Sequence, residues 1–228
     1  MADVGSAIGH AIPFGIAVAL SPFPIIAMVL VLATPRGAVN GAALALGSLA
    51  GLITVGGGLL VIANLLDPSD GGDPADWVSV AKLGLAVVLI RLAVMQWRKR
   101  PVAGATPELP AWMATFDDIT AARAAGMGVL LSAVNPKNLV LVIAAAAAIA
   151  DTGTAAGAQA AGLAVFVALA MLGVTVPLTM SLLLGVRADP ILAGVREWMA
   201  RESATIMTAI LILIAAKLVG DAVTGLTA

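Results

Sequence analysis

The stretches that decide the fold are SPFP at 21–24, followed by the apolar run IIAMVLVLA, and NPKN at 135–138, followed by LVLVIAAAAAIA. Each places a small polar residue and a proline in the middle of a long hydrophobic segment. Proline removes a backbone N–H donor and its ring clashes with the preceding helical turn, so an α-helix stops there. We therefore predict two interrupted helices, one broken at Pro22 and the other at Pro136.

The composition places these motifs in a membrane. Of 228 residues, 61% are hydrophobic and 11% are charged, and the mean hydropathy is +1.08, well beyond the values of soluble globular proteins. Because a helix needs roughly 20 apolar residues to cross the hydrocarbon core, the chain has room for about six spans. We predict them at 7–33, 39–65, 78–97, 121–150, 155–185 and 204–223.

The residue types exclude several classes of function. The chain has no cysteine and a single histidine, His10, so thiol chemistry and a metal site built from cysteine or histidine are not expected. A serine hydrolase needs a base beside its nucleophile, and His10 lies in the same predicted span as Ser21 without being able to reach it. A Ser21–Lys137 pair is a much weaker alternative. We expect no enzyme activity, no cofactor, no metal and no nucleic-acid partner.

The charges of the loops predict the orientation in the membrane. The second loop carries four aspartates and no base, and the fourth carries only Asp151. The positive-inside rule then makes the first, third and fifth loops cytoplasmic and both termini extracytoplasmic. This describes a multi-pass protein of the cytoplasmic membrane. The bases that decide the orientation are Arg36, Arg98, Lys99, Arg100, Arg123, Arg187, Arg196 and Arg201.

The two halves of the chain resemble each other. When the SPFP run is laid over the NPKN run without a gap, a small polar residue, a proline and the apolar positions that follow all match. A gap of two residues then aligns GAVNGA (37–42) with GTAAGA (153–158), each opening the next span. Because three spans are an odd number, the second half enters the membrane from the opposite side.

The predicted fold is therefore an all-α integral membrane protein with six transmembrane helices arranged as a 3+3 inverted-topology repeat. Helices one and four are broken at the proline motifs. The halves cover 1–97 and 121–228, and the basic cytoplasmic connector at 98–120 joins them into one membrane domain.

The proline motifs have the chemistry of helix starts. Ser21 and Asn135 are good N-cap residues, and Pro22 and Pro136 occupy the first helical position. Two positive half-helix ends would then meet near the middle of the membrane. Non-helical backbone is tolerated at that depth only where protein or a water-filled cavity surrounds it. The alternative is a pair of proline kinks without a ligand.

Four bases lie within predicted spans. Lys82 and Arg91 lie near span ends, where their side chains are expected to snorkel to the interface. Lys217 is expected to pair with Asp221, four residues further along the same helix. Arg91, Lys217 and Asp117, an acid just before span four, are secondary candidates for the site.

Lys137 differs from these bases. It lies at the centre of a 30-residue apolar segment with no carboxylate within sequence reach, and an unpaired charge there costs several kcal/mol. We predict an anion site formed by its ammonium, the two helix starts and the side-chain amides of Asn135 and Asn138. The alternative is a structural bond from Lys137 to backbone carbonyls.

The segment before the last span has an amphipathic pattern. In PILAGVREWMARES (190–203), the apolar residues share one helical face. This predicts a short helix lying on the cytoplasmic surface. The residues of this face are Ile191, Leu192, Val195, Trp198 and Met199.

Three stretches resemble one known family: SPFPIIAMVLVLATPRGAVNGAALALG (21–47), AVMQWRKRP (93–101) and FDDITAARAAGMGVLLSAVNPKNLVLVIAAAAAIA (116–150). They are similar to the GAP proteins, the peptidoglycolipid- or sulfolipid-addressing membrane proteins of mycobacteria and relatives. That family is grouped with the lysine exporter superfamily of six-span transporters. The resemblance implies an actinobacterial source and delivery of envelope glycolipids. It also implies a functional core formed by Ser21, Pro22, Pro24, Asn135, Pro136, Lys137 and Asn138.

The leading hypothesis is therefore a transporter or export factor for an anionic or polar envelope glycolipid of the peptidoglycolipid or sulfolipid type. Small residues such as GSLAG (47–51) would let its helices pack closely. A second hypothesis is an accessory scaffold in a lipid synthesis or export complex. A third is an exporter of a small anionic or amino-acid-like solute. The expected partners are membrane lipids and the glycolipid; a larger export machinery and a homo-oligomer both stay open.

Overall fold

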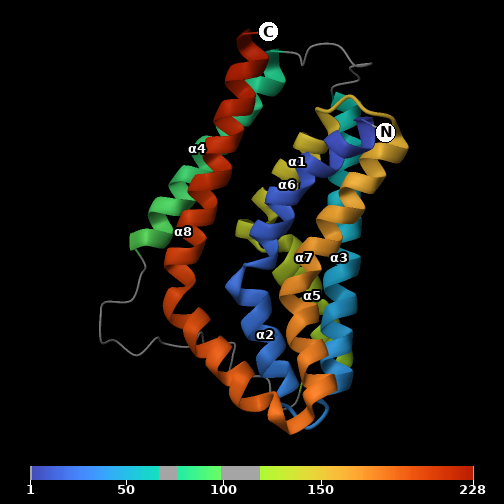
Figure 1. The fold of residues 1–228 in the computed structure, drawn as a ribbon, viewed down its shortest axis with the longest axis vertical. Helices are drawn as coiled ribbons and strands as arrows, with labels where there is room; N and C mark the ends of the chain where they lie inside the picture. Colours follow the sequence, from blue (N-terminus) through green and yellow to red (C-terminus); the bar gives the residue numbers. More distant parts are fainter. Residues whose placement is uncertain (1, 67–75, 99–118, 228) are drawn as a thin grey trace.

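A computed structural model describes residues 2–66, 76–98 and 119–227, and within these ranges every regular element is a helix (Figure 1). The all-helical fold class is therefore confirmed. The elements are α1 (Ala2–Ala19), α2 (Pro22–Leu32), α3 (Gly37–Leu66), α4 (Asp76–Arg98), α5 (Ala121–Val129), the π-helix η2 (Leu130–Val134), α6 (Pro136–Ala150), α7 (Ala156–Leu184), the 3₁₀ turn η3 (Gly185–Arg187) and α8 (Asp189–Thr227).

The described helices fit a multi-pass membrane protein. Four of them, α3, α4, α7 and α8, contain stretches long and apolar enough to cross a membrane. Two further pairs, α1 with α2 and α5–η2 with α6, pass the same test together but are sharply bent at a short break. If each bent pair is one span, the total is six. Each of the six predicted segments coincides with one of these units.

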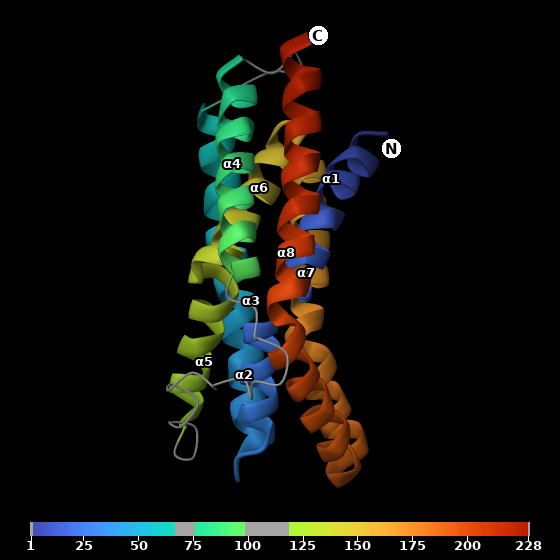
Figure 2. The ribbon, with the colours of Figure 1, turned by 90° about the vertical axis from the view of Figure 1, so that its left-hand side faces the viewer.

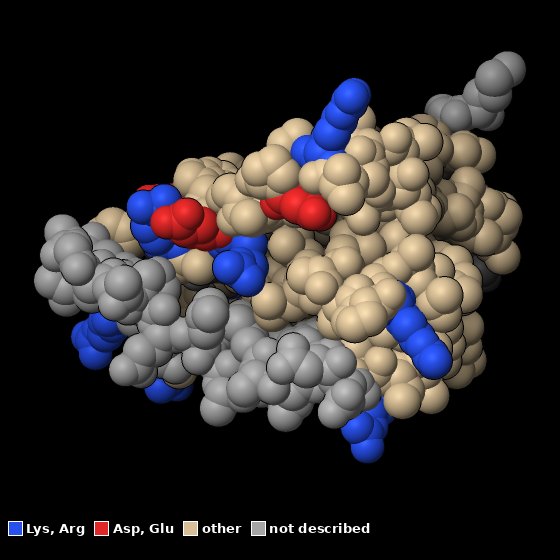
Figure 3. Space-filling model, turned by 90° about the horizontal axis from the view of Figure 1, so that it is seen from below, with Lys and Arg blue, Asp and Glu red and all other residues tan. Residues whose placement is uncertain are grey.

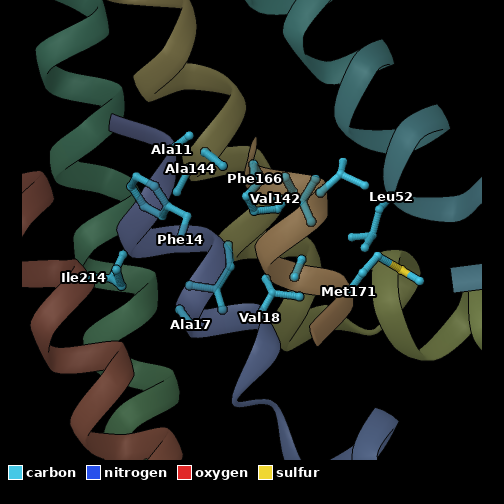
Figure 4. Packing of buried hydrophobic residues seen from close by; sticks show 14 of the residues in the cluster. Ala11, Phe14, Ala17, Val18, Leu52, Val142, Ala144, Phe166, Met171 and Ile214 are labelled. Carbon is cyan, nitrogen blue, oxygen red and sulfur yellow. The ribbon is translucent and has the colours of Figure 1, made fainter. Parts of the chain in front are cut away.

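The helices pack in three main pairs. α1 packs against α7, α3 against α5, and α4 against α8. Figures 1 and 2 show α4 and α8 side by side along one flank of the molecule. The main core cluster draws buried residues from α1 to α8, and Figure 4 shows Phe14 of α1 and Phe166 of α7 within it. This arrangement places α6, the second part of a bent span, in the interior, where it contacts α1, α3, α4 and α7.

Glycines bring neighbouring helices into backbone contact. A Cβ added at Gly47 on α3 would lie 1.9 Å from the carbonyl oxygen of Ala125 on α5. One added at Gly128 on α5 would lie 2.1 Å from the carbonyl oxygen of Leu44. No side chain fits in that space, so the close packing predicted for GSLAG (47–51) is confirmed.

The amphipathic segment before the last span is not a separate surface helix. It forms the first turns of α8, which continues unbroken from Asp189 to Thr227. Leu192 and Met199 are buried against apolar side chains of α2, while Trp198 stays exposed. The expectation of a separate short helix is therefore wrong. No proline or glycine pair interrupts the chain between this segment and the span, and α2 covers part of its apolar face.

Candidate functional site

The first break lies where the sequence predicts it. α1 ends at Ala19, α2 begins at Pro22, and the two axes are bent by 51°. Ser21 is the N-cap residue, but its side chain makes no capping hydrogen bond. Pro22 and Pro24 carry no N–H, so Phe23 offers the one backbone donor among the first three residues of α2. Ser21, Pro22 and Pro24 are all buried.

The second break has a different local structure. The chain widens into a π-helical turn at Leu130–Val134, and the backbone N–H of Asn135 donates to the Leu130 carbonyl oxygen at 2.6 Å. α6 then begins at Pro136, with an axis bent by 58° from the preceding helix. Both breaks at the proline motifs are therefore confirmed. Isolated π-turns of this kind are frequent at functional sites.

The two asparagines of NPKN bond to the broken backbone. Asn135 Oδ1 accepts from the backbone N–H of Lys137 at 3.1 Å and so caps α6. Asn138 Nδ2 donates to the Leu131 carbonyl oxygen at 2.9 Å and so caps the helix that has just ended. Asn138 is fully buried, and its Oδ1 has no hydrogen-bond partner among the residues that the structure describes. The free position of this amide is thus a hydrogen-bond acceptor, which calls for a ligand or water that donates.

The two breaks meet through their second helical residues. The Nζ atom of Lys137, in α6, lies 4.9 Å from the centroid of the Phe23 ring, in α2. This distance is typical of a cation–π contact. Lys137 is half-buried and Pro136 is exposed. The starts of α2 and α6 therefore come together at this contact, as the sequence predicts, although the sequence does not identify Phe23 as the contact.

The secondary candidates lie elsewhere. Lys217 Nζ is 2.5 Å from Asp221 Oδ2, which confirms the predicted pair, and also lies 5.8 Å from the Phe14 ring centroid. It therefore rests against α1 and not at the helix starts. Arg91 is exposed on α4. Asp117 lies outside the described residues.

Lys82 is the clearest departure from the sequence-based expectation. Its Nζ atom is 2.5 Å from Asp151 Oδ2, and the two side chains are only 4% and 16% exposed. The expectation that Lys82 snorkels is therefore wrong, because it forms a buried ion pair between α4 and the C-cap of α6. A signal was present in the sequence. Asp151 is the one acid of the fourth loop, and that loop was assigned to the same membrane face as the start of span three.

The opposite end of the bundle is rich in exposed arginines. Among the described residues, the turns and helix ends away from the two termini carry Arg36, Arg98, Arg123 and Arg187. Figure 3 looks at this end and shows basic side chains spread around it. At the end near the termini, Lys82 and Lys217 are both held in ion pairs. The charge asymmetry read from the loops is thus also an asymmetry of the folded molecule.

Comparison with protein-family models finds a match over most of the chain. The family model described as Sap, sulfolipid-1-addressing protein, matches residues 12–224, a range that includes both breaks. The description indicates a role in the export or addressing of a sulfolipid or related glycolipid. No curated protein and no solved structure matches the chain.

Proposed function

The chain belongs to the Sap, sulfolipid-1-addressing protein family, and on this premise we propose that it moves an anionic or polar envelope glycolipid across or out of the cytoplasmic membrane. The family match confirms the resemblance found in the sequence. The proposal goes beyond the family match in three respects: that the protein itself moves the lipid, which site recognises the lipid, and how the protein is oriented in the membrane.

The observation that carries the proposal is the meeting of the two half-helix starts at Lys137 and Phe23. Helix N-termini are electropositive, and the ammonium of Lys137 adds a full charge beside them. Asn138 Oδ1 supplies a buried acceptor close by in the same helical turn. An anionic headgroup that also carries hydroxyl groups complements both features. In transporters with inverted repeats, substrates bind at discontinuous helices of this kind.

The helix pairing supports the 3+3 inverted repeat. In this repeat, α1, α3 and α4 of the first half correspond to α5, α7 and α8 of the second. The pair α1–α7 then corresponds to the pair α5–α3, and the pair α4–α8 corresponds to itself. Both of the corresponding pairs are present in the structure. We propose that the halves, 1–97 and 121–228, move against each other to expose the site alternately to the two faces.

We further propose that the arginine-rich end lies in the cytoplasm. The positive-inside rule then makes both termini extracytoplasmic. The Lys82–Asp151 pair would lie toward the extracytoplasmic face, while Lys137 would lie between the two faces.

A second candidate function is that of an accessory scaffold for a larger lipid-export machinery. The observation in its favour is the packing of the first break, where Ser21 is 1% exposed and Pro22 and Pro24 are buried as well. A packed break fits a structural subunit, or a transporter whose path is closed in this conformation.

Substitution of Lys137 tests the site. A hydrogen bond to a charged group contributes about 1.5–3 kcal/mol, so Lys137→Gln should reduce export roughly tenfold to a hundredfold. Lys137→Glu should abolish it, because a carboxylate repels the anion. Each variant is expressed in a host that lacks the native protein, and surface glycolipid and membrane protein levels are measured together. Arg123→Gln, which removes an exposed base from α5, is the matched control. Normal export by well-expressed Lys137→Glu would refute the anion site.

Reconstitution separates the transporter from the scaffold. The purified protein in liposomes should move a fluorescent sulfated glycolipid between leaflets, and Lys137→Gln should slow this movement. If the wild-type protein moves no lipid in liposomes but restores export in cells, the scaffold function is the correct one.

A further inference from the structure

A second candidate site lies away from the two breaks. A cavity of about 330 Å³ is lined by residues of α3, α4, α6 and α8, and this lining is apolar except at Lys82 and Asp151. This volume is at the lower end of the roughly 300–1,000 Å³ of small-molecule sites. Ile62 and Val88, both exposed, belong to the lining. The cavity therefore reaches the surface on α3 and α4, two helices that can each cross a membrane.

The polar wall of the cavity, formed by Lys82 and Asp151, has an unused hydrogen-bond acceptor, and its positive charge is already paired. The ammonium of Lys82 is neutralised by Asp151 Oδ2 at 2.5 Å. The other oxygen, Asp151 Oδ1, is buried and has no hydrogen-bond partner in the described part of the chain. Buried polar atoms are normally hydrogen-bonded, so a group that donates is missing from this wall.

We propose that this cavity binds one hydrocarbon chain of a membrane lipid, and that a hydroxyl group of that lipid's headgroup donates a hydrogen bond to Asp151 Oδ1. The apolar lining fits the chain. The ion pair favours a hydroxyl group over an anion. A hydroxyl group can donate to the Asp151 carboxylate, whereas an anionic group would be repelled by it. A glycolipid supplies both parts. The inference rests on the proposed function for the class of lipid, whereas the site is separate from the one at Lys137.

Photocrosslinking of the purified, full-length protein tests the position of the site. The protein is placed in nanodiscs with a glucosyl diacylglycerol that carries a diazirine in one chain, and crosslinked residues are identified by mass spectrometry. We expect adducts on the cavity lining, such as Leu59, Leu85 and Ile143. Ala147→Phe on α6 and Ala63→Phe on α3 fill the cavity from two walls and should each reduce these adducts at least about tenfold. Ala168→Phe, on the exposed face of α7, should leave them unchanged.

A competition experiment tests the hydroxyl. The unlabelled glucosyl lipid should displace the probe, and the same lipid with a permethylated headgroup should compete about tenfold less well, since it has no donor. Equal competition by the two lipids would overturn the hydroxyl contact and leave Asp151 Oδ1 to water. Adducts only on residues outside the cavity would overturn the site. So would adducts that persist in both filled variants, provided that thermal unfolding shows these variants to be folded.

The readout is binding, so the two proposals fail separately. If the wild-type protein gives no adducts in the cavity while export still depends on Lys137, only the cavity proposal is refuted. If the wild-type protein gives adducts in the cavity but the Lys137 variants export normally, only the anion site at Lys137 is refuted.

Discussion

Removing one partner of the Lys82–Asp151 pair should destabilise the protein more than removing both. The two side chains are 4% and 16% exposed, and their atoms lie 2.5 Å apart. Removal of one member of a buried ion pair costs about 3–5 kcal/mol, because the other charge is left uncompensated. Because the ammonium is the more buried of the two, Asp151→Asn should fall near the upper end of this range. Lys82→Met leaves the more exposed carboxylate and should fall near the lower end.

The same reasoning predicts the double variant and a control. Lys82→Met combined with Asp151→Asn leaves no buried charge, so it should be more stable than either single variant. Lys217→Met is the control, because Lys217 lies at the same 2.5 Å distance from Asp221 but the side chains are 25% and 29% exposed. Partly exposed pairs contribute up to about 1 kcal/mol, so this variant should lose much less stability than Lys82→Met.

Reversible unfolding in mixed detergent micelles provides the measurement. Helicity is followed by circular dichroism as sodium dodecyl sulfate is added, and the free energy of unfolding is extrapolated to zero denaturing detergent. Two results would refute the reasoning: equal losses for Lys82→Met and Lys217→Met, or a double variant less stable than both single variants. Either would mean that burial does not decide what this pair contributes.

Two further predictions concern packing and orientation. Gly47→Ala should lower the free energy of unfolding by about 1–3 kcal/mol through overpacking against Ala125, whereas Gly58→Ala, where nothing lies within 4 Å, should be neutral or stabilising in the same assay; equal effects would contradict the close contact. In this cysteine-free chain, an impermeant maleimide added to intact cells should label Ala155→Cys but not Val186→Cys, and the reverse pattern would overturn the orientation.

The sequence by itself was enough to predict the six apolar segments and the interruption of two of them. Six apolar segments and the breaks at Pro22 and Pro136 follow from forces that act within one or two turns. These are the length of the apolar run, the missing proline N–H and the clash of its ring with the preceding turn. The Lys217–Asp221 pair was predictable for the same reason, since a spacing of four residues puts both side chains on one face of a helix.

Only the tertiary structure decided which distant groups meet. Lys82 and Asp151 are 69 residues apart, and their contact depends on how α4 lies against α6. The contact of Phe23 with Lys137 likewise depends on how the starts of α2 and α6 are placed by the helices around them. Asn138 looked like a ligand donor in the sequence, but the π-turn at Leu130–Val134 brings the Leu131 carbonyl within reach of its amide. Helix placement rests on backbone contacts such as that of Gly47 with Ala125, and local sequence does not specify the partner of such a contact.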